Sequence, residues 1–405
     1  MDWTSSRTLS IQVQTKMTII ETPFLKSIKT YTLQLMGLAI VIKLSLVLVA
    51  YGLQYFGLAN PSHPFTLGVF NLSECFQMYS NADSGWYQTI AEYGYNGVPE
   101  LLSKSWSHPN SHFAFFPLYP CLVSSLMWLC SIDFHAAAYI LSCLVLLLLS
   151  FSLMSLLTAL KMAPKTAYRI GCLYLLFPLS LHCFFNYTEA LFLSFMCLSF
   201  AAIIEKRLGL LMLSAACLVL CRPNGLFLFF PFLLLIVEQQ QLPWYTGKWT
   251  WLKQSWIWAL GVMPLVFAAW LLFQWYLVGD ALAFSHAQAA WNKQFMFPLL
   301  ALFRQGFWDY QLVSCYCVAI LLYALWIRKQ LPISSNVLVW INLLLPLSAG
   351  SVVSMMRYSS VIFPLHLYWQ NKLSQSKYFA IFIGLFVLLQ IVLLKFWLEG
   401  QAIMY

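Results

Sequence analysis

Long apolar runs without a single charge constrain this chain more than any other feature. Residues 141–160 and 379–394 contain no Asp, Glu, Lys or Arg, and a helix that spans a membrane needs about 20 such residues. The runs do not alternate between polar and apolar residues, as the strands of a membrane β-barrel do. They predict an all-α, polytopic transmembrane protein.

Composition and charge agree with a chain dissolved in lipid. Hydrophobic residues make up 61% of the 405 residues and charged residues only 9%, against about a quarter charged in soluble proteins. The net charge of +9 comes from 22 basic residues that stand singly or in small groups between apolar segments. This pattern is typical of membrane-flanking anchors and not of a nucleic-acid-binding stripe. We therefore expect membrane lipids and no nucleic acid among the partners.

A single membrane domain, residues 1–405, accounts for the whole chain, without internal repeats. Residues 1–32 are expected to form a cytoplasmic N-terminal segment, and residues 59–112 a large first outer loop. The predicted apolar segments are 33–58, 113–131, 134–160, 167–184, 188–205, 208–221, 223–238, 257–278, 309–327, 333–353, 358–371 and 378–398.

Basic residues set the predicted orientation, because they favour the cytoplasmic side in short loops. Arg7, Lys16, Lys26 and Lys29 place the N-terminus inside. The later basic groups should also lie inside; these are Lys161, Lys165 and Arg169, then Lys206 and Arg207, Lys248 and Lys253, Arg328 and Lys329, and Lys372 and Lys377. If segment 113–131 crosses the membrane fully, the basic group at Lys161 would lie on the outer side instead. Whether this segment crosses or only dips into the membrane stays open.

The residues that could carry chemistry collect on the predicted outer side. They are Asp83, residues 186–189, Arg222, residues 280–304 and Arg357. Segments 208–221 and 358–371 are shorter than a full span, so the arginines beside them should lie below the outer headgroups. Charges at that depth normally face protein or a water-filled cavity. We expect a pocket open to the outside.

Several sequence motifs point to one family. Residues 81–95 read NADSGWYQTIAEYGY, and residues 112–120 read HFAFFPLYP. Further along the chain stand Asn186-Tyr-Thr-Glu189, Arg222-Pro-Asn-Gly225, residues 279–291 and Arg357-Tyr-Ser-Ser-Val-Ile-Phe-Pro364. In this order, over most of the chain, they resemble the PIG-V family of mannosyltransferases, which includes the second mannosyltransferase of glycosylphosphatidylinositol anchor assembly and bacterial relatives. Ala82 replaces a tryptophan that this family commonly has before the aspartate.

The resemblance implies a GT-C glycosyltransferase fold of about 11 to 12 helices, with the catalytic carboxylate on the first outer loop. It implies transfer of a hexose, expected to be mannose, from a polyprenyl or dolichyl phosphate to a hydroxyl of a lipid-linked or glycan acceptor. The chain has no DxD pair, no P-loop and no GxGxxG motif, so the usual nucleotide-sugar and ATP sites are not supported. No prosthetic group or metal is assigned.

Asp83 is the predicted catalytic base for the acceptor hydroxyl. The alternative is a structural aspartate that caps a helix or turn, since Asp-Ser-Gly is also a turn sequence.

Cationic residues are the candidates for binding the donor phosphate. Arg357 and Arg222 could bind phosphate oxygens in a bidentate way, or could instead be interfacial anchors that extend to the surface. His112 is a third candidate for the phosphate.

Polar and aromatic residues on the same side could bind the sugar or the acceptor. Glu189 and Asn186 could hold sugar hydroxyls or cap a helix. Trp86 and Tyr87 could stack on sugar or belong to the interfacial aromatic belt. His286 completes this group.

Two other classes of protein remain open. A transporter or glycolipid flippase would also contain many helices with a few buried charges, but such transporters usually show inverted repeats. A non-enzymatic assembly subunit would not need Asp83 together with two sunken arginines. The compact chain without an endoplasmic-reticulum retention tail favours a bacterial inner membrane over the endoplasmic reticulum as the location.

Overall fold

Helices form nearly all the regular structure of this chain. The computed structural model describes residues 5–103, 110–239, 255–304, 311–401 and 404, and these contain no β-strand. The first half comprises α1 (Ser5–Tyr55), α2 (Leu72–Gln77), α3 (Ser84–Tyr93), α4 (Glu100–Ser103), η1 (Ser111–Ala114), α5 (Leu118–Cys130), α6 (Phe134–Ala159), α7 (Pro164–Leu176), η2 (Pro178–Phe184), α8 (Glu189–Ile204) and α9 (Leu208–Cys221).

The second half continues the same architecture. It comprises η3 (Pro223–Leu228), α10 (Phe229–Gln239), α11 (Ser255–Ala259), α12 (Val262–Val278), α13 (Ala283–His286), η6 (Ala287–Trp291), η7 (Pro298–Leu300), α14 (Ala301–Arg304), α15 (Gln311–Ile327), η8 (Arg328–Gln330), α16 (Ile333–Ser348), α17 (Met355–Ser360), α18 (Phe363–Ser374) and α19 (Phe379–Leu398). The predicted basic pair Lys248 and Lys253 lies outside the described residues.

Five described helices are long and apolar enough to cross a membrane: 23–55, 134–159, 255–278, 311–330 and 379–398. A sixth crossing is possible if α7 and η2 count as one bent span. The prediction of an α-helical membrane protein is confirmed at this level. The GT-C fold and the expected 11 to 12 membrane helices stay predictions.

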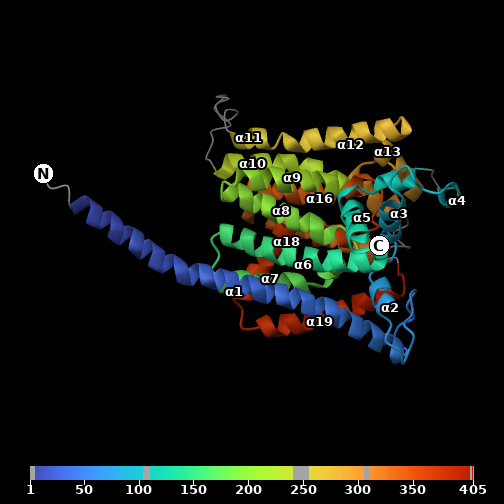
Figure 1. The fold of residues 1–405 in the computed structure, drawn as a ribbon, viewed down its shortest axis with the longest axis horizontal. Coiled ribbons are helices and arrows are strands. Elements are labelled where there is room, and N and C mark those ends of the chain that lie inside the picture. The colour runs from blue at the N-terminus through green and yellow to red at the C-terminus, as the bar shows by residue number, and fades with distance from the viewer. Residues whose placement is uncertain (1–4, 104–109, 240–254, 305–310, 402–403, 405) are drawn as a thin grey trace.

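The long helices run side by side, and the loops that carry the candidate residues gather at one end of them. Figure 1 shows that α1 extends beyond the other helices at its N-terminal end. Helices α2, α3, α4 and α13 lie at the opposite end of the bundle. The predicted outer loops 59–112 and 280–304 therefore share one end of the molecule. The first of them is not irregular, since short helices (α2, α3, α4 and η1) occupy much of it.

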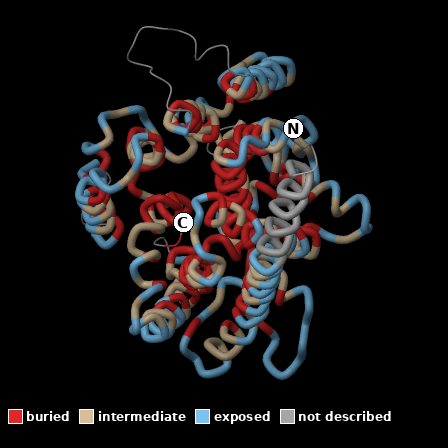
Figure 2. Tube along the Cα trace, turned by 90° about the vertical axis from the view of Figure 1, so that its left-hand side faces the viewer, coloured by how far each residue is buried: buried red, intermediate tan, exposed pale blue. Residues whose placement is uncertain are grey.

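Buried residues form the centre of the helix bundle, and exposed ones lie around its periphery (Figure 2). Helix α8 is the most enclosed element, because it packs against α6, α9 and α10 and nearly all of its side chains are buried. Apolar residues surround its whole circumference, as expected of a central helix. Its first residue, Glu189, starts this buried helix at the end where the loops gather.

The predicted segment 113–131 contains a helix that is shorter than a straight crossing of the membrane. Only α5 is regular within it, and 13 residues rise about 20 Å where the hydrocarbon core is about 30 Å thick. If the segment does not cross, the later basic groups all lie on the predicted inner side and the conflict is removed.

The predicted segment 167–184 is broken, which the hydropathy pattern did not show. Helix α7 ends before Phe177, and η2 leaves at an angle of 82° to it. Phe177 adopts an extended backbone conformation (ψ 134°), because Pro178 disfavours the helical region for the residue before it. The bend leads the chain back through residues 185–188 to the start of α8.

The predicted segment 358–371 is also divided, into α17 and α18. Pro364 stands at the beginning of α18, where a proline without an N–H is tolerated. Arg357 thereby lies on a helix of its own, α17, which has six residues.

Candidate active site

Four charged side chains from four separate segments meet at the loop-bearing end of the bundle. Asp83 lies directly before α3, Glu189 begins α8, Arg222 follows α9, and Arg357 belongs to α17. All four were predicted site residues. They form what we call the ion cluster.

Arg357 stands at the centre of the ion cluster. Its Nη1 lies 2.6 Å from Oδ2 of Asp83, and its Nε lies 3.1 Å from Oε1 of Glu189. Arg222 contacts the same oxygen of Glu189 through Nη2, and its Nε donates to the Thr188 hydroxyl at 2.7 Å. One carboxylate oxygen of Glu189 thus receives both guanidinium groups.

Burial differs sharply within the ion cluster. The Glu189 side chain is 0% exposed and that of Arg357 only 7%, whereas Asp83 keeps 25% of its side chain exposed. Burial alone would lower the pKa of Arg357, but the carboxylates of Asp83 and Glu189 raise that pKa well above its ordinary value. Arg357 is therefore always charged, and Asp83 is the acid of the cluster that a substrate can reach most easily.

Aromatic rings surround the two arginines. The Arg357 guanidinium lies 4.8 Å from the centre of the Tyr187 ring and 5.2 Å from that of Tyr358. Arg222 lies 5.7 Å from the same Tyr358 ring. The faces of aromatic rings attract cations, so the rings stabilise the arginines without neutralising them.

Hydrogen bonds fix residues 185–188 against the first outer loop. Asn186 Nδ2 donates to the Ser80 hydroxyl at 2.8 Å, and the Asn186 backbone N–H donates to the Tyr79 carbonyl at 3.0 Å. Ser84, next to Asp83, donates to the Asn186 carbonyl at 3.2 Å. These bonds place Asp83 and Glu189 on either side of Arg357.

Unusual backbone conformations precede both partners of the central ion pair. Ala82, directly before Asp83, has φ of 45°, and Ser354, three residues before Arg357, has φ of 70°. Residues other than glycine rarely adopt this left-handed region, and such strain is concentrated at functional sites.

The capping role predicted as the alternative for Asp83 is not what its side chain does. Asp83 occupies the N-cap position of α3, but its carboxylate makes no capping hydrogen bond. Asp133 provides the contrast, because it caps α6 by accepting the Ala136 N–H at 3.0 Å. Helix α8 also has no side-chain cap, so neither Asn186 nor Glu189 plays that part.

Two buried acceptor atoms beside the ion cluster have no hydrogen-bond donor among the described residues. They are Oε2 of Glu189 and Oδ1 of Asn186. Buried polar atoms are almost always hydrogen-bonded, and exceptions require an explanation. Both atoms belong to residues that the sequence predicted to hold sugar hydroxyls.

Tyr87 joins the site, and Trp86 packs against other aromatic rings of the outer loops. The Tyr87 hydroxyl lies 3.4 Å from that of Thr188, and burial, assisted by the charge of Asp83, raises the pKa of Tyr87. The Trp86 ring stacks on Phe115 at 5.7 Å and meets Trp291 edge-on at 5.5 Å. It thereby links the first outer loop to the loop after α12.

The two predicted histidines lie apart from the ion cluster. His112 is buried, its Nε2 is 3.0 Å from the Tyr95 carbonyl, and burial lowers its pKa. His286 is exposed, and its Nδ1 contacts Asp280 at 2.7 Å. Burial of His112 favours the neutral imidazole, and its assignment to the donor phosphate stays a prediction.

Sequence reasoning missed three residues that line the ion cluster. Thr188 binds Arg222, while Tyr187 and Tyr358 pack against the guanidinium groups. Each stands next to a predicted site residue, inside the motifs at 186–189 and 357–364. That adjacency was the only available signal.

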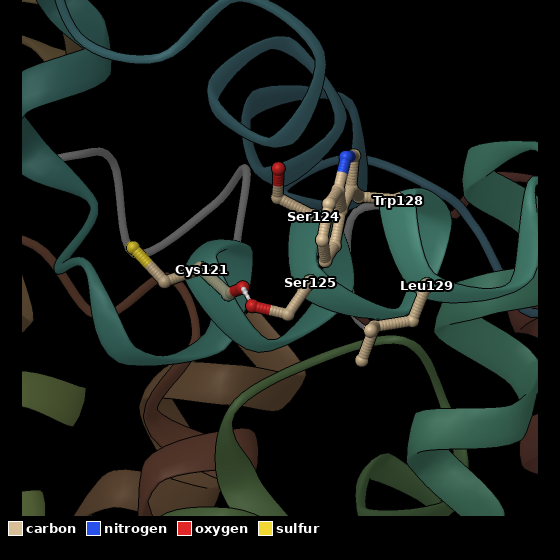
Figure 3. A pocket seen from close by; sticks show the side chains of 5 residues that line it. All are labelled: Cys121, Ser124, Ser125, Trp128 and Leu129. Carbon is tan, nitrogen blue, oxygen red and sulfur yellow. Dashed lines mark hydrogen bonds between the residues drawn. The ribbon is translucent and has the colours of Figure 1, made fainter.

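A surface hollow of about 480 Å³ lies elsewhere, along α5, and is lined by Cys121, Ser124, Ser125, Trp128 and Leu129 (Figure 3). Only the Ser125 hydroxyl makes a hydrogen bond there, to the Cys121 carbonyl. No member of the ion cluster lines it. We assign no chemistry to this hollow.

Comparisons with protein-family models, curated proteins and solved structures find no match to this chain. Among the described residues, no group of three or more His, Cys, Asp or Glu side chains could hold a metal ion. The argument for function therefore depends on the ion cluster and on the resemblance of the motifs.

Proposed function

We propose that this protein is a membrane glycosyltransferase that moves a hexose, mannose in the first instance, from a polyprenyl or dolichyl phosphate to an acceptor hydroxyl on the non-cytoplasmic side. The observation that carries the proposal is the ion cluster. It places a partly exposed carboxylate, Asp83, against the buried Arg357, with Arg222 paired to the neighbouring Glu189, at one end of a bundle of apolar helices.

In the proposed reaction Asp83 accepts the proton of the acceptor hydroxyl. The acceptor oxygen forms a bond to C1 of the sugar, while the bond between C1 and the phosphate oxygen breaks. The electron pair of the broken bond stays on the phosphate, which leaves as a lipid monophosphate with one more negative charge. An already ionised phosphate needs no proton to leave, so a single base is sufficient.

The remaining members of the site support the carboxylate and the sugar. Arg357 fixes the position of the Asp83 carboxylate, as pre-organised charges do in catalysis. Glu189 and Asn186 offer the two acceptor atoms without donors, which sugar hydroxyls could satisfy. The GT-C fold, the sugar and the lipid donor are part of this proposal.

Purified protein in proteoliposomes would test the proposal. Radiolabelled polyprenyl-phosphate mannose is supplied with a host lipid extract as acceptor, and transfer of label and release of polyprenyl phosphate are measured. We expect both in wild type and neither in Asp83→Asn. Counterflow of labelled glycolipid without transfer would instead establish the transporter or flippase alternative.

A further inference from the structure

The charges of the ion cluster balance, which raises the question of what holds the donor phosphate. Asp83 and Glu189 carry two negative charges, and Arg222 and Arg357 carry two positive ones. Each arginine already contacts a carboxylate. An arriving phosphate would have to break a buried ion pair or find a further cation.

The segment after η6 carries such a cation, Lys293, next to the turn between α16 and α17. The Gln294 N–H donates to the Ala349 carbonyl at 3.1 Å, and the Met296 N–H donates to the Ser348 carbonyl at 2.9 Å. These carbonyls stand at the end of α16, in the turn that leads into α17. Lys293 therefore lies in a segment whose backbone is hydrogen-bonded to the turn that leads into α17, the helix of Arg357.

This contact between the two segments is tight. Gly350 has φ of 77°, and a Cβ at this position would lie only 2.8 Å from the Gln294 carbonyl oxygen and 2.6 Å from Nη1 of Arg304. Only glycine fits such an approach without displacing a neighbour. The position of Lys293 over the α16–α17 turn is thus determined by backbone packing.

The charge of Lys293 acts on Tyr358, the tyrosine whose ring lies beside both arginines. Nη2 of Arg357 donates to the Tyr358 hydroxyl at 3.5 Å. Burial acts to raise the pKa of Tyr358, but the positive charges of Lys293 and the two arginines bring it below its ordinary value. Within the described part of the chain, Lys293 is in no ion pair.

We propose that Lys293 binds the phosphate of the lipid donor and that the two arginines chiefly position Asp83 and Glu189. This inference rests on the proposed function. A lysine ammonium is a mobile point charge that can follow a phosphate. Because the phosphate gains one negative charge when the sugar leaves, Lys293 stabilises the departing lipid monophosphate more strongly than the intact donor.

Binding of a soluble lipid monophosphate tests this role without requiring the acceptor. The probe is farnesyl phosphate, measured by quenching of tryptophan fluorescence in purified wild type, Lys293→Ala and Lys293→Arg. Loss of one charge-assisted hydrogen bond should weaken binding about 10-fold to 100-fold in Lys293→Ala, and Lys293→Arg should restore most of it. Transfer assays with saturating lipid extract should show a raised donor KM and a lowered kcat in Lys293→Ala.

Lys395→Ala is the matched control. Lys395 lies in the last turn of α19, near the same end of the bundle, and is paired with Glu399 at 3.8 Å. Its loss should leave probe binding unchanged, so a general effect of positive charge is separated from a specific one. Unaltered elution and thermal unfolding of Lys293→Ala would show that the variant is folded.

Each further outcome has a distinct meaning. Wild-type affinity in folded Lys293→Ala would overturn the role of Lys293 while leaving the proposed function intact. A wild type that neither binds farnesyl phosphate nor transfers sugar would overturn the proposed function, and the inference with it. Equal affinity for inorganic phosphate would assign Lys293 to a soluble anion and overturn the lipid donor as its ligand.

Discussion

The Arg357 guanidinium lies 2.6 Å from the Asp83 carboxylate. Arg357 belongs to α17, and Asp83 to the first outer loop. The pair joins the beginning and the end of the chain at one site. Because Arg357 is also 3.1 Å from Glu189, any change at Asp83 alters how the whole ion cluster is charged.

Asp83→Asn should abolish sugar transfer while sparing the fold and donor binding. General-base assistance contributes about 10² to 10⁴ in rate, so a loss of that order is expected. The substitution leaves Arg357 with one fewer negative neighbour, and lipid phosphate should therefore bind as well as in wild type or more tightly. Transfer rates and farnesyl phosphate affinity check both parts.

Asp133→Asn is the control for a structural aspartate. Asp133 is a true cap of α6, and asparagine caps helices about as well as aspartate. Transfer should continue at the wild-type rate. Near-normal turnover in Asp83→Asn as well would show that Asp83 is structural, and Glu189 and Glu92 would become the next acids to test.

Arg357→Ala should lower stability as well as activity. Removal of one partner from a buried ion pair costs about 3–5 kcal/mol, because it leaves an uncompensated charge. Arg357→Lys should recover only part of the stability and part of the activity, since one ammonium cannot replace a guanidinium that contacts two carboxylates. Thermal unfolding in detergent and transfer rates provide the measurement.

Arg207→Ala provides the comparison for an exposed ion pair. Arg207 is 59% exposed and stands 3.7 Å from Glu205, and such surface pairs contribute about 0–1 kcal/mol. Its unfolding temperature should stay close to that of wild type. Equal stability of Arg357→Ala and Arg207→Ala would contradict the buried pairing.

The general architecture and several site residues could be predicted from the sequence. Uncharged apolar runs predicted membrane helices, and the inside-outside pattern of basic residues placed Asp83, Arg222 and Arg357 on one side. The structure brings these three together with Glu189. Short motifs identified the segments because each carries a charge beside an apolar helix, where a charge is costly without a role.

The pairing itself could not be predicted. Arg357 and Asp83 are far apart in the sequence, and hydropathy does not reveal which charges meet. The break at Phe177 was hidden because apolar residues continue on both sides of Pro178. Lys293 lacked any signal, since a single lysine in a polar loop is normally solvated. Backbone bonds from Gln294 and Met296 hold its segment against the end of α16.

The orientation can be tested by labelling single cysteines. In a background in which the exposed Cys121, Cys130 and Cys315 are changed to serine, a cysteine at Asn110 should react with an impermeant maleimide from outside. A cysteine at Lys26 should react only after permeabilisation, because basic residues favour the cytoplasm. The reverse labelling would refute the proposed orientation of the site.

Glu189→Gln should destabilise the protein more than Asp83→Asn does, although both remove one negative charge. Glu189 is 0% exposed and receives both arginines on a single oxygen, whereas Asp83 is 25% exposed. Asp83→Asn leaves Glu189 beside Arg357, whereas Glu189→Gln removes the one carboxylate oxygen that Arg222 and Arg357 share. Two buried guanidinium groups would then repel each other with only Asp83 to compensate.

Glu238→Gln separates this effect from the loss of any partly buried acid that accepts a hydrogen bond. Glu238 accepts a hydrogen bond from the Ser334 N–H at 3.0 Å but is paired with no cation among the described residues. Loss of its charge should therefore change the free energy of unfolding by about 1 kcal/mol, against several kcal/mol for Glu189→Gln. If chemical unfolding gave equal values for Glu189→Gln and Glu238→Gln, Glu189 would not be the anion that holds the two arginines together.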